Sequence, residues 1–188
     1  MWGKVLKASG AVAEQCAADK GGWDLVTSKI RHGTDAEGRG WWEQGDPTLY
    51  TEENERKRQS LRHHPAVEQA LETWWTTAMS TIEADGRAKE EFLRKDDYIM
   101  VSKCMYKALI ETYDEDEAIA EAEDDWEKDS QGTGALGKKL FLDAMFELAD
   151  MWTETITAEE YRGFLDQLFQ CVAEAQPDGS YIWKVRRV

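Results

Sequence analysis

The sequence predicts an all-α protein with three parts: an extended arm over residues 1–64, a helical module over residues 65–175, and a short extended or β tail over residues 176–188. Apolar residues recur at intervals of three and four throughout the central part, which is the spacing of one helix face. The first part is punctuated by glycines and has weak helical periodicity, which is typical of loops. The end of the chain, over residues 181–187, alternates with the period of a strand and needs an edge to pair with.

Composition places the chain among water-soluble globular proteins. Hydrophobic residues make up 41% and charged residues 32% of the 188 residues. No apolar run approaches the ~20 residues that a membrane span needs, and the N-terminus lacks the apolar core of a signal peptide. The three cysteines are widely spaced and form no C-x-x-C pair, which favours free thiols in a reducing compartment. We therefore expect a cytoplasmic protein without membrane partners.

Charge divides the chain into two regions. The formal net charge is -15, yet residues 1–64 hold ten basic and ten acidic side chains, so the remainder carries the whole excess. Nucleic acid is not an expected partner, because phosphate contacts need clustered Lys and Arg.

The arm combines many glycines with large aromatic side chains. Short helices are expected near residues 11–20 and 23–31, a loop over 32–47, and a charged helix without an apolar face near 52–62. Large aromatics in a segment with little core of its own often anchor a partner surface. Packing of these side chains on the helical module is the alternative interpretation. The candidate anchors of the arm are Trp2, Trp23, Trp41 and Trp42.

The central module is expected to contain about five helices. Pro65 suits the first turn of a helix whose apolar face continues to Ile82, and further helices are expected after Asp97, from Asp114 to Trp126, from Lys138 to Trp152, and from Thr157 to about Ala175. Their apolar faces together predict a core. Its expected members are Leu71, Trp74, Met105, Leu109, Phe141, Met145, Leu148, Phe164 and Leu168.

A weak internal repeat links residues 92–98 with residues 156–161. Each segment reads aliphatic, two residues, two acids, tyrosine, and then opens an apolar-periodic helix. Thr157 with Glu160 makes a capping box. Two ordinary helix starts would explain the acids, but not the aliphatic residue or the tyrosine.

The stretch 125–169 has the plan of an EF-hand: a helix, a Gly-rich turn, one aliphatic residue and a second helix. In such a loop the aliphatic residue stands at position eight and pairs with its twin in a short ladder, so we expect the repeat residues Leu93 and Ile156 to pair. A calcium loop also needs oxygen ligands and a bidentate Glu at position twelve. In the Gly-rich loop, positions one, three, five and twelve are filled by Asp129, Gln131, Thr133 and Leu140.

Only one carboxylate remains among those four positions, and position twelve is aliphatic. The loops that would begin at Gly86 and Ala149 retain Asp97 and Glu160 at position twelve but little else. We therefore expect no metal, no calcium and no other cofactor.

Three motifs carry a resemblance to a known group of proteins. They are W-x-x-D-x-x-G-x-G-x-L from Trp126 to Leu136, F-x-D-x-M-F-E-L-A-D-x-W-T from Phe141 to Thr153, and I-x-x-E-E-Y-x-x-F-L from Ile156 to Leu165. Over roughly residues 66–175 the chain resembles the degenerate EF-hand-like domains of ciliary and flagellar axonemal proteins, which are associated with doublet microtubules.

The resemblance implies a structural component of the axoneme, bound on or inside the microtubule wall. Its partners would be tubulin and other axonemal proteins, and its location the cilium or flagellum. Tubulin is acidic and would repel residues 65–188, so contact is expected through the neutral arm and the tail. The candidate partner-binding residues of the tail are Trp183, Lys184, Arg186 and Arg187.

Two other functions compete with a structural role. A calcium sensor or regulatory protein would suit the acidic balance, but the ligand count opposes it. An enzyme is not expected, because the sequence has no nucleophile elbow, phosphate loop or metal triad, and the Gly132-x-Gly134 pair follows a helix and not a strand.

Overall fold

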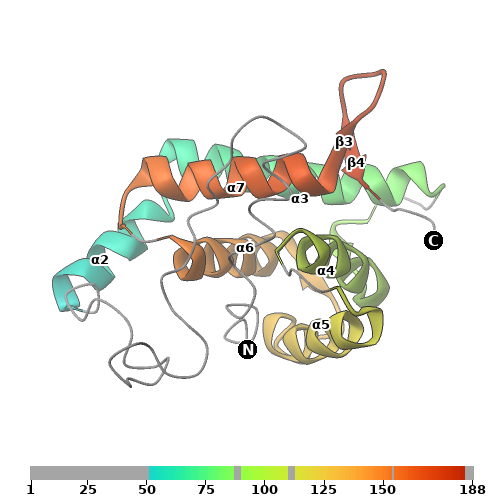
Figure 1. Cartoon of the computed structure of the whole chain (residues 1–188), viewed down its shortest axis with the longest axis horizontal. Helices are drawn as coiled ribbons and strands as arrows, with labels where there is room; N and C mark the ends of the chain where they lie inside the picture. The colour runs from blue at the N-terminus through green and yellow to red at the C-terminus, as the bar shows by residue number, and fades with distance from the viewer. Residues whose placement is uncertain (1–50, 87–89, 110–112, 154, 185–188) are drawn as a thin grey trace.

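The computed structural model describes residues 51–86, 90–109, 113–153 and 155–184, which form six helices and two short antiparallel ladders (Figure 1). The predicted anchors of the arm, and Arg186 and Arg187 of the tail, lie outside these residues. The helices are α2 (Glu52–Leu61), α3 (Pro65–Ala84), α4 (Lys95–Leu109), α5 (Glu115–Asp129), α6 (Lys138–Trp152) and α7 (Ala158–Val172). The strands are β1 (Phe92–Leu93), β2 (Leu136–Gly137), β3 (Ala173–Ala175) and β4 (Tyr181–Trp183).

Helices α3 and α7 form one layer of the module, and they lie side by side in Figure 1. Pro65 opens α3 as predicted, and the His64 side chain accepts a hydrogen bond from the Ala66 amide at 3.3 Å. The indole of Trp74 donates to the Leu165 carbonyl at 3.2 Å, which joins the two helices inside the core. Helices α4, α5 and α6 pack beneath this layer.

The core confirms the predicted apolar faces. The five helices between residues 65 and 175 appear as expected, and all nine predicted core residues are buried. Trp74, Phe141 and Leu148 are among the residues with 1% or less of their surface exposed. The helical periodicity of the sequence was therefore sufficient to identify the inward faces.

The central ladder corrects the expected pairing of aliphatic residues. Leu93 lies opposite Leu136, and Phe92 lies opposite Gly137. Ile156, which the repeat suggested as the twin of Leu93, lies in the turn before α7 and packs at the edge of the core. The residue joined to Leu93 is thus the aliphatic residue of the Gly-rich loop, because that loop lies beside β1.

The last helix ends earlier than the predicted end near Ala175. Helix α7 ends at Val172, and the chain then forms a hairpin in which β3 pairs with β4 around a turn over residues 176–180. The turn is where the sequence predicted it, and Gly179 adopts a φ of 87°, which favours glycine. Trp183 is only 2% exposed, so β4 belongs to the module and does not form a separate tail.

The N-terminal boundary also shifts. Helix α2 begins after Thr51, whose side chain accepts a hydrogen bond from the Asn54 amide at 3.3 Å. It has the charged composition that the sequence predicted, but Leu61 is buried and two arginines contact α6. Residues 51–64 are therefore part of the folded module. Among the described helices, none combines the length and apolar character that a membrane crossing requires.

Candidate functional site

Two helix–loop–helix units meet at the central ladder. The first unit is α3, its loop and α4, and the second is α5, its loop and α6. The β1–β2 pairing joins the loops back to back, and Leu93 and Leu136 at its centre are 1% and 0% exposed. These joined loops hold the predicted calcium positions and are the first candidate site.

The second loop satisfies its own polar groups. The Thr133 hydroxyl lies 2.7 Å from the Ser130 carbonyl and 2.6 Å from the Ala135 carbonyl. Gln131 and Gly134 both adopt positive φ, at 52° and 73°, so the backbone turns sharply through this segment. The Thr133 oxygen, which would be a ligand in a calcium loop, is therefore used to hold the turn.

Asp129, the remaining carboxylate of this loop, is bonded to another helix. The Tyr98 hydroxyl of α4 donates to its Oδ2 at 2.5 Å. Burial raises the pKa of the Asp129 carboxyl and the tyrosine hydrogen bond lowers it, with burial the larger effect. Burial, followed by the charge of Asp129, raises the pKa of the Tyr98 hydroxyl, so the tyrosine stays a donor at neutral pH.

Asp125 lies one helical turn before Asp129 and is 7% exposed. Burial, followed by the negative charge of Asp129, raises the pKa of the Asp125 carboxyl to about 7. Two carboxylates thus share the buried end of α5, and only one of them receives the tyrosine hydroxyl. The sequence motif identified Asp129, but it gave no sign that Asp125 would be buried.

The carboxylates of the first loop also have protein partners. Asp97 accepts a hydrogen bond from the Arg94 amide at 3.0 Å, which caps the start of α4. Glu90 accepts from the Arg94 guanidinium at 3.1 Å. Leu140 occupies position twelve of the second loop and packs at the edge of the core. Within residues 51–86, 90–109, 113–153 and 155–184, no three His, Cys, Asp or Glu side chains are grouped so that they could hold a metal ion.

The two repeat tyrosines have equivalent roles. Tyr161, the fourth residue of α7, donates its hydroxyl to Asp150 near the end of α6. Tyr98, the fourth residue of α4, does the same to Asp129 at the end of α5. Each tyrosine therefore satisfies a carboxylate at a helix C-terminus, where the helix dipole does not favour negative charge. The repeat pointed to the tyrosines, but not to the aspartates that they bind.

The capping box after the third loop is formed in part. The Thr157 hydroxyl accepts from the Glu160 amide at 3.4 Å, as predicted. The Glu160 carboxylate accepts from the Thr155 amide at 2.7 Å and so reaches two residues further back than the motif suggests.

The predicted partner-binding residues of the tail are engaged within the module. Trp183 packs against Trp74 and Phe169, with ring centroids 5.3 and 6.1 Å away. The Lys184 ammonium donates to the Gln170 carbonyl at 2.8 Å and to the Cys171 carbonyl at 3.2 Å, which caps the end of α7. Both side chains thus contact the module itself, and their role in binding a partner stays a prediction.

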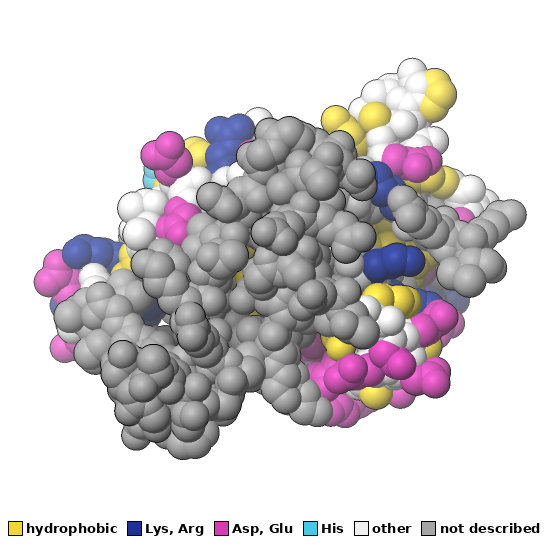
Figure 2. All heavy atoms as spheres, viewed as in Figure 1, with side chains coloured by type: hydrophobic (Ala, Val, Ile, Leu, Met, Phe, Trp, Pro, Cys, Tyr) yellow, Lys and Arg dark blue, Asp and Glu magenta, His cyan; other side chains and the backbone are white. Residues whose placement is uncertain are grey.

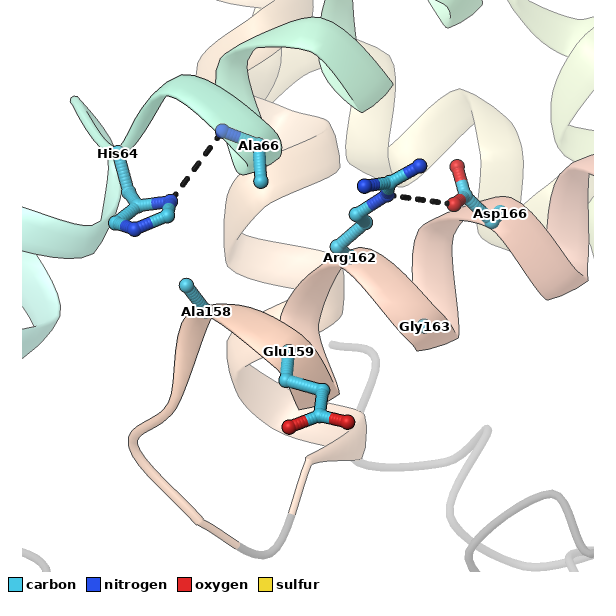
Figure 3. Close-up of a pocket in the computed structure, with 7 residues that line it drawn as sticks. All are labelled: His64, Ala66, Ala158, Glu159, Arg162, Gly163 and Asp166. Carbon is cyan, nitrogen blue, oxygen red and sulfur yellow. Dashed lines mark hydrogen bonds and ion pairs between the residues drawn. The ribbon is translucent and has the colours of Figure 1, made fainter.

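A shallow hollow of about 460 Å³ lies between the first turns of α3 and α7 (Figure 3). His64 and Arg162 line it, but His64 is bonded to the Ala66 amide and Arg162 to Asp166 at 3.0 Å. Glu159 extends away from the Arg162–Asp166 pair in Figure 3. The charged groups of the hollow are thus used in local contacts and do not converge on a common point.

Acidic side chains gather over α5. Figure 2 shows Asp and Glu clustered where Figure 1 places this helix. Lys103 pairs with Glu115, and Lys95 pairs with Glu123 at 3.1 Å. The exposed acidic residues of α5 are Glu115, Asp116, Glu117, Glu123, Asp124 and Glu127.

Comparison of the chain with family models, with curated proteins and with solved structures found no match in any of the three.

Proposed function

We propose that this chain is a structural component of the ciliary or flagellar axoneme, a degenerate EF-hand-like protein bound to the microtubule wall. The arrangement of two helix–loop–helix units joined at one aliphatic pair is the plan of paired EF-hands. The motifs that resemble axonemal proteins run from the end of α5 through most of α6 into the first half of α7.

The observation that carries a structural role is that protein groups hydrogen-bond to the carboxylates of the paired loops. The Tyr98 hydroxyl donates a hydrogen bond to Asp129, and the Arg94 amide donates one to Asp97. Leu140 stands where a bidentate Glu would bind calcium. In the part of these loops that the structure describes, the Asp129 and Asp97 carboxylates thus already accept hydrogen bonds from protein groups. The two units are joined by the pairing of Leu93 with Leu136, and a joint of this kind suits a permanent part of an assembly better than a switch.

The intramolecular contacts of the tail also bear on which residues this proposal assigns to microtubule binding. With Trp183 and Lys184 engaged inside the module, contact with the microtubule is assigned to the tryptophans of residues 1–50 and to Arg186 and Arg187. The acidic face of α5 would be repelled by acidic tubulin, so in this proposal it faces away from the wall, toward basic surfaces of other axonemal proteins.

Calorimetry with calcium tests the structural interpretation against a sensor. The wild-type chain should bind calcium more weakly than about 10⁻³ M, because sensor loops at about 10⁻⁷–10⁻⁵ M depend on several carboxylates and the bidentate Glu. A matched variant with Gln131→Asp, Thr133→Asp and Leu140→Glu restores three ligands in the second loop and should gain measurable affinity. A micromolar isotherm reaching one ion per wild-type chain would support the sensor and end this part of the proposal.

Localisation tests the assembly itself. A tagged full chain expressed in a ciliated cell should remain with the doublet microtubules after detergent and salt extraction. A variant lacking residues 1–50 should fold but fail to be retained. Uniform cytosolic staining of the full chain, with complete extraction by detergent, would contradict the proposal.

A further inference from the structure

The contact between α2 and the rest of the module differs in kind from the packing of the other described helices. Helix α2 buries one residue, Leu61, whereas each of the other five buries at least four. Burial of a single leucine contributes on the order of 2 kcal/mol of hydrophobic stabilisation. Apolar burial therefore accounts for little of what holds this helix in place.

Two ion pairs also join the end of α2 to α6. Arg58 and Arg62 are one helical turn apart on the end of α2, and Asp150 and Asp143 are two turns apart on α6. The Arg58 Nε atom lies 3.0 Å from Asp150 Oδ1, and the Arg62 guanidinium is paired with Asp143. The Arg62 guanidinium also lies over the Phe146 ring, 4.8 Å from its centroid.

These ion pairs are incompletely buried. The side chains of the first pair are 17% and 32% exposed, and those of the second are 25% and 26% exposed. The Arg62 Nε is buried and has no hydrogen-bond partner among the described residues. Pairs of this exposure remain sensitive to ionic strength, because the Debye length shortens from about 30 Å at 0.01 M to 3 Å at 1 M.

The connection to α3 is a short hydrogen-bonded turn, in which the His64 amide donates to the Leu61 carbonyl at 2.9 Å. Only Arg62, His63 and His64 separate Leu61 from Pro65. Helix α3 begins with its own cap, since the His64 side chain accepts from the Ala66 amide. The buried face of α3 starts at Val67 and packs mainly against β4, α7 and α6, so most of its packing comes from elements other than α2.

We propose that α2 is a strap, latched to α6 by charge, that opens as a unit while the other five described helices stay packed. Opening would release Asp143 and Asp150 of α6 from their arginine partners, on either side of Glu147, which is already exposed.

Hydrogen–deuterium exchange of the full chain, read by mass spectrometry, tests the strap. In Arg58→Gln and in Asp143→Asn, amides of residues 54–61 should exchange roughly 5- to 30-fold faster, as expected for losing one or two kcal/mol of latching energy. Arg56→Gln is the matched control, because among the described residues Arg56 pairs with Glu52 on its own exposed helix face. It removes the same charge from the same helix and should leave exchange within about twofold of wild type.

Salt supplies a second measurement on the unmodified chain. Raising KCl about twentyfold, from roughly 0.05 M to 1 M, should accelerate exchange in residues 54–61 without accelerating exchange of the amides of α3 and α7. Equal exchange in Arg58→Gln and Arg56→Gln, together with no response to salt, would show that α2 is held by apolar contact and would overturn the latch. Exchange that rises in α3 and α7 together with α2 would show that α2 is an integral part of the core and would overturn the strap.

Discussion

At the scale of single residues, Phe141 connects the apolar faces of α6 and α3. Its ring lies 5.7 Å from that of Trp75 and is 1% exposed. Phe141→Ala should therefore lower the free energy of unfolding by about 3–5 kcal/mol, because the lost transfer energy adds to the cost of a cavity. Urea denaturation followed by tryptophan fluorescence measures this difference.

Phe92 is the matched control for that substitution, since it is 37% exposed at the edge of the loop ladder. Phe92→Ala should cost about 1 kcal/mol or less. Equal losses at the two positions would show that the Phe141 site collapses around the smaller side chain and that the predicted apolar stripe does not dominate stability.

Asp125 makes the stability of the module depend on pH. Its pKa is raised to about 7 in the folded chain, above the ordinary value of 3.8, so between these values the folded state binds more protons than the unfolded state. Stability therefore falls as pH rises through this window. With about 1.4 kcal/mol per pKa unit, the loss is on the order of 2–4 kcal/mol.

Asp125→Asn removes the charge and should flatten that decline, so that the variant exceeds wild type in stability above pH 7 and matches it near pH 4. Urea midpoints of the variant and the wild type, measured from pH 4 to above pH 7, test whether the two stabilities diverge as pH rises. Asp124→Asn removes the same charge from an exposed neighbour and should run parallel to wild type. Parallel curves for both variants would mean that Asp125 ionises freely in the folded chain.

Which residues are buried could be predicted from the sequence, but which polar groups they meet could not. Phe141 and Trp74 follow from periodicity, because an apolar stripe has one favourable side. The Tyr98–Asp129 and Arg58–Asp150 contacts join side chains that are 31 and 92 positions apart, and local pattern does not determine such distances. For the same reason the engagement of Lys184 by α7 was not visible in the sequence.

At the scale of secondary-structure elements, two glycines should respond to alanine with opposite signs. Gly163 lies inside α7, and an added Cβ there would meet no atom within 4 Å. Gly163→Ala should raise the free energy of unfolding by about 0.5–1 kcal/mol, because alanine restricts the unfolded chain and favours the helix.

Gly134 turns the second loop with a φ of 73°, a conformation that an L side chain rarely adopts. Gly134→Ala should lower stability by about 1 kcal/mol, although there is space for its methyl group. Thermal melts of the two variants give the comparison. A destabilised Gly163→Ala would indicate that α7 is distorted at this position in solution.

Element order was predictable, whereas the pairing of short strands was not. Five helices with their apolar faces could be located from spacing, and the turn at residues 176–180 from its Pro-Asp-Gly sequence. The repeat favoured pairing of Leu93 with Ile156 because the sequences around these two residues are similar. The structure pairs Leu93 with Leu136 because two-residue strands are positioned by the helices that flank them. The hairpin was missed because alternation in β4 does not reveal which strand it joins.

At the scale of the whole molecule, the net charge of -15 should make salt stabilise the module. Like charges on residues 65–188 repel one another in the compact state, and added salt screens that repulsion. The urea midpoint should therefore rise as NaCl is increased at neutral pH, even though the same salt loosens α2. Repeating the titration near pH 4.6, where the net charge vanishes, should abolish the increase. A midpoint that falls with salt at neutral pH would mean that favourable ion pairs outweigh repulsion across the module.

The packing of Trp74 against Trp183 gives the fold an optical signature. Their rings lie 5.3 Å apart and are tilted by 39°, which is close enough for the excited states of two indoles to couple. Such coupling produces a pair of circular-dichroism bands of opposite sign that neither ring produces alone. Because one ring comes from α3 and the other from β4, the signal reports whether the C-terminal hairpin is packed against α3. It would disappear in a chain whose helices are intact but whose hairpin has come away, a state that measurements of helix content would not detect.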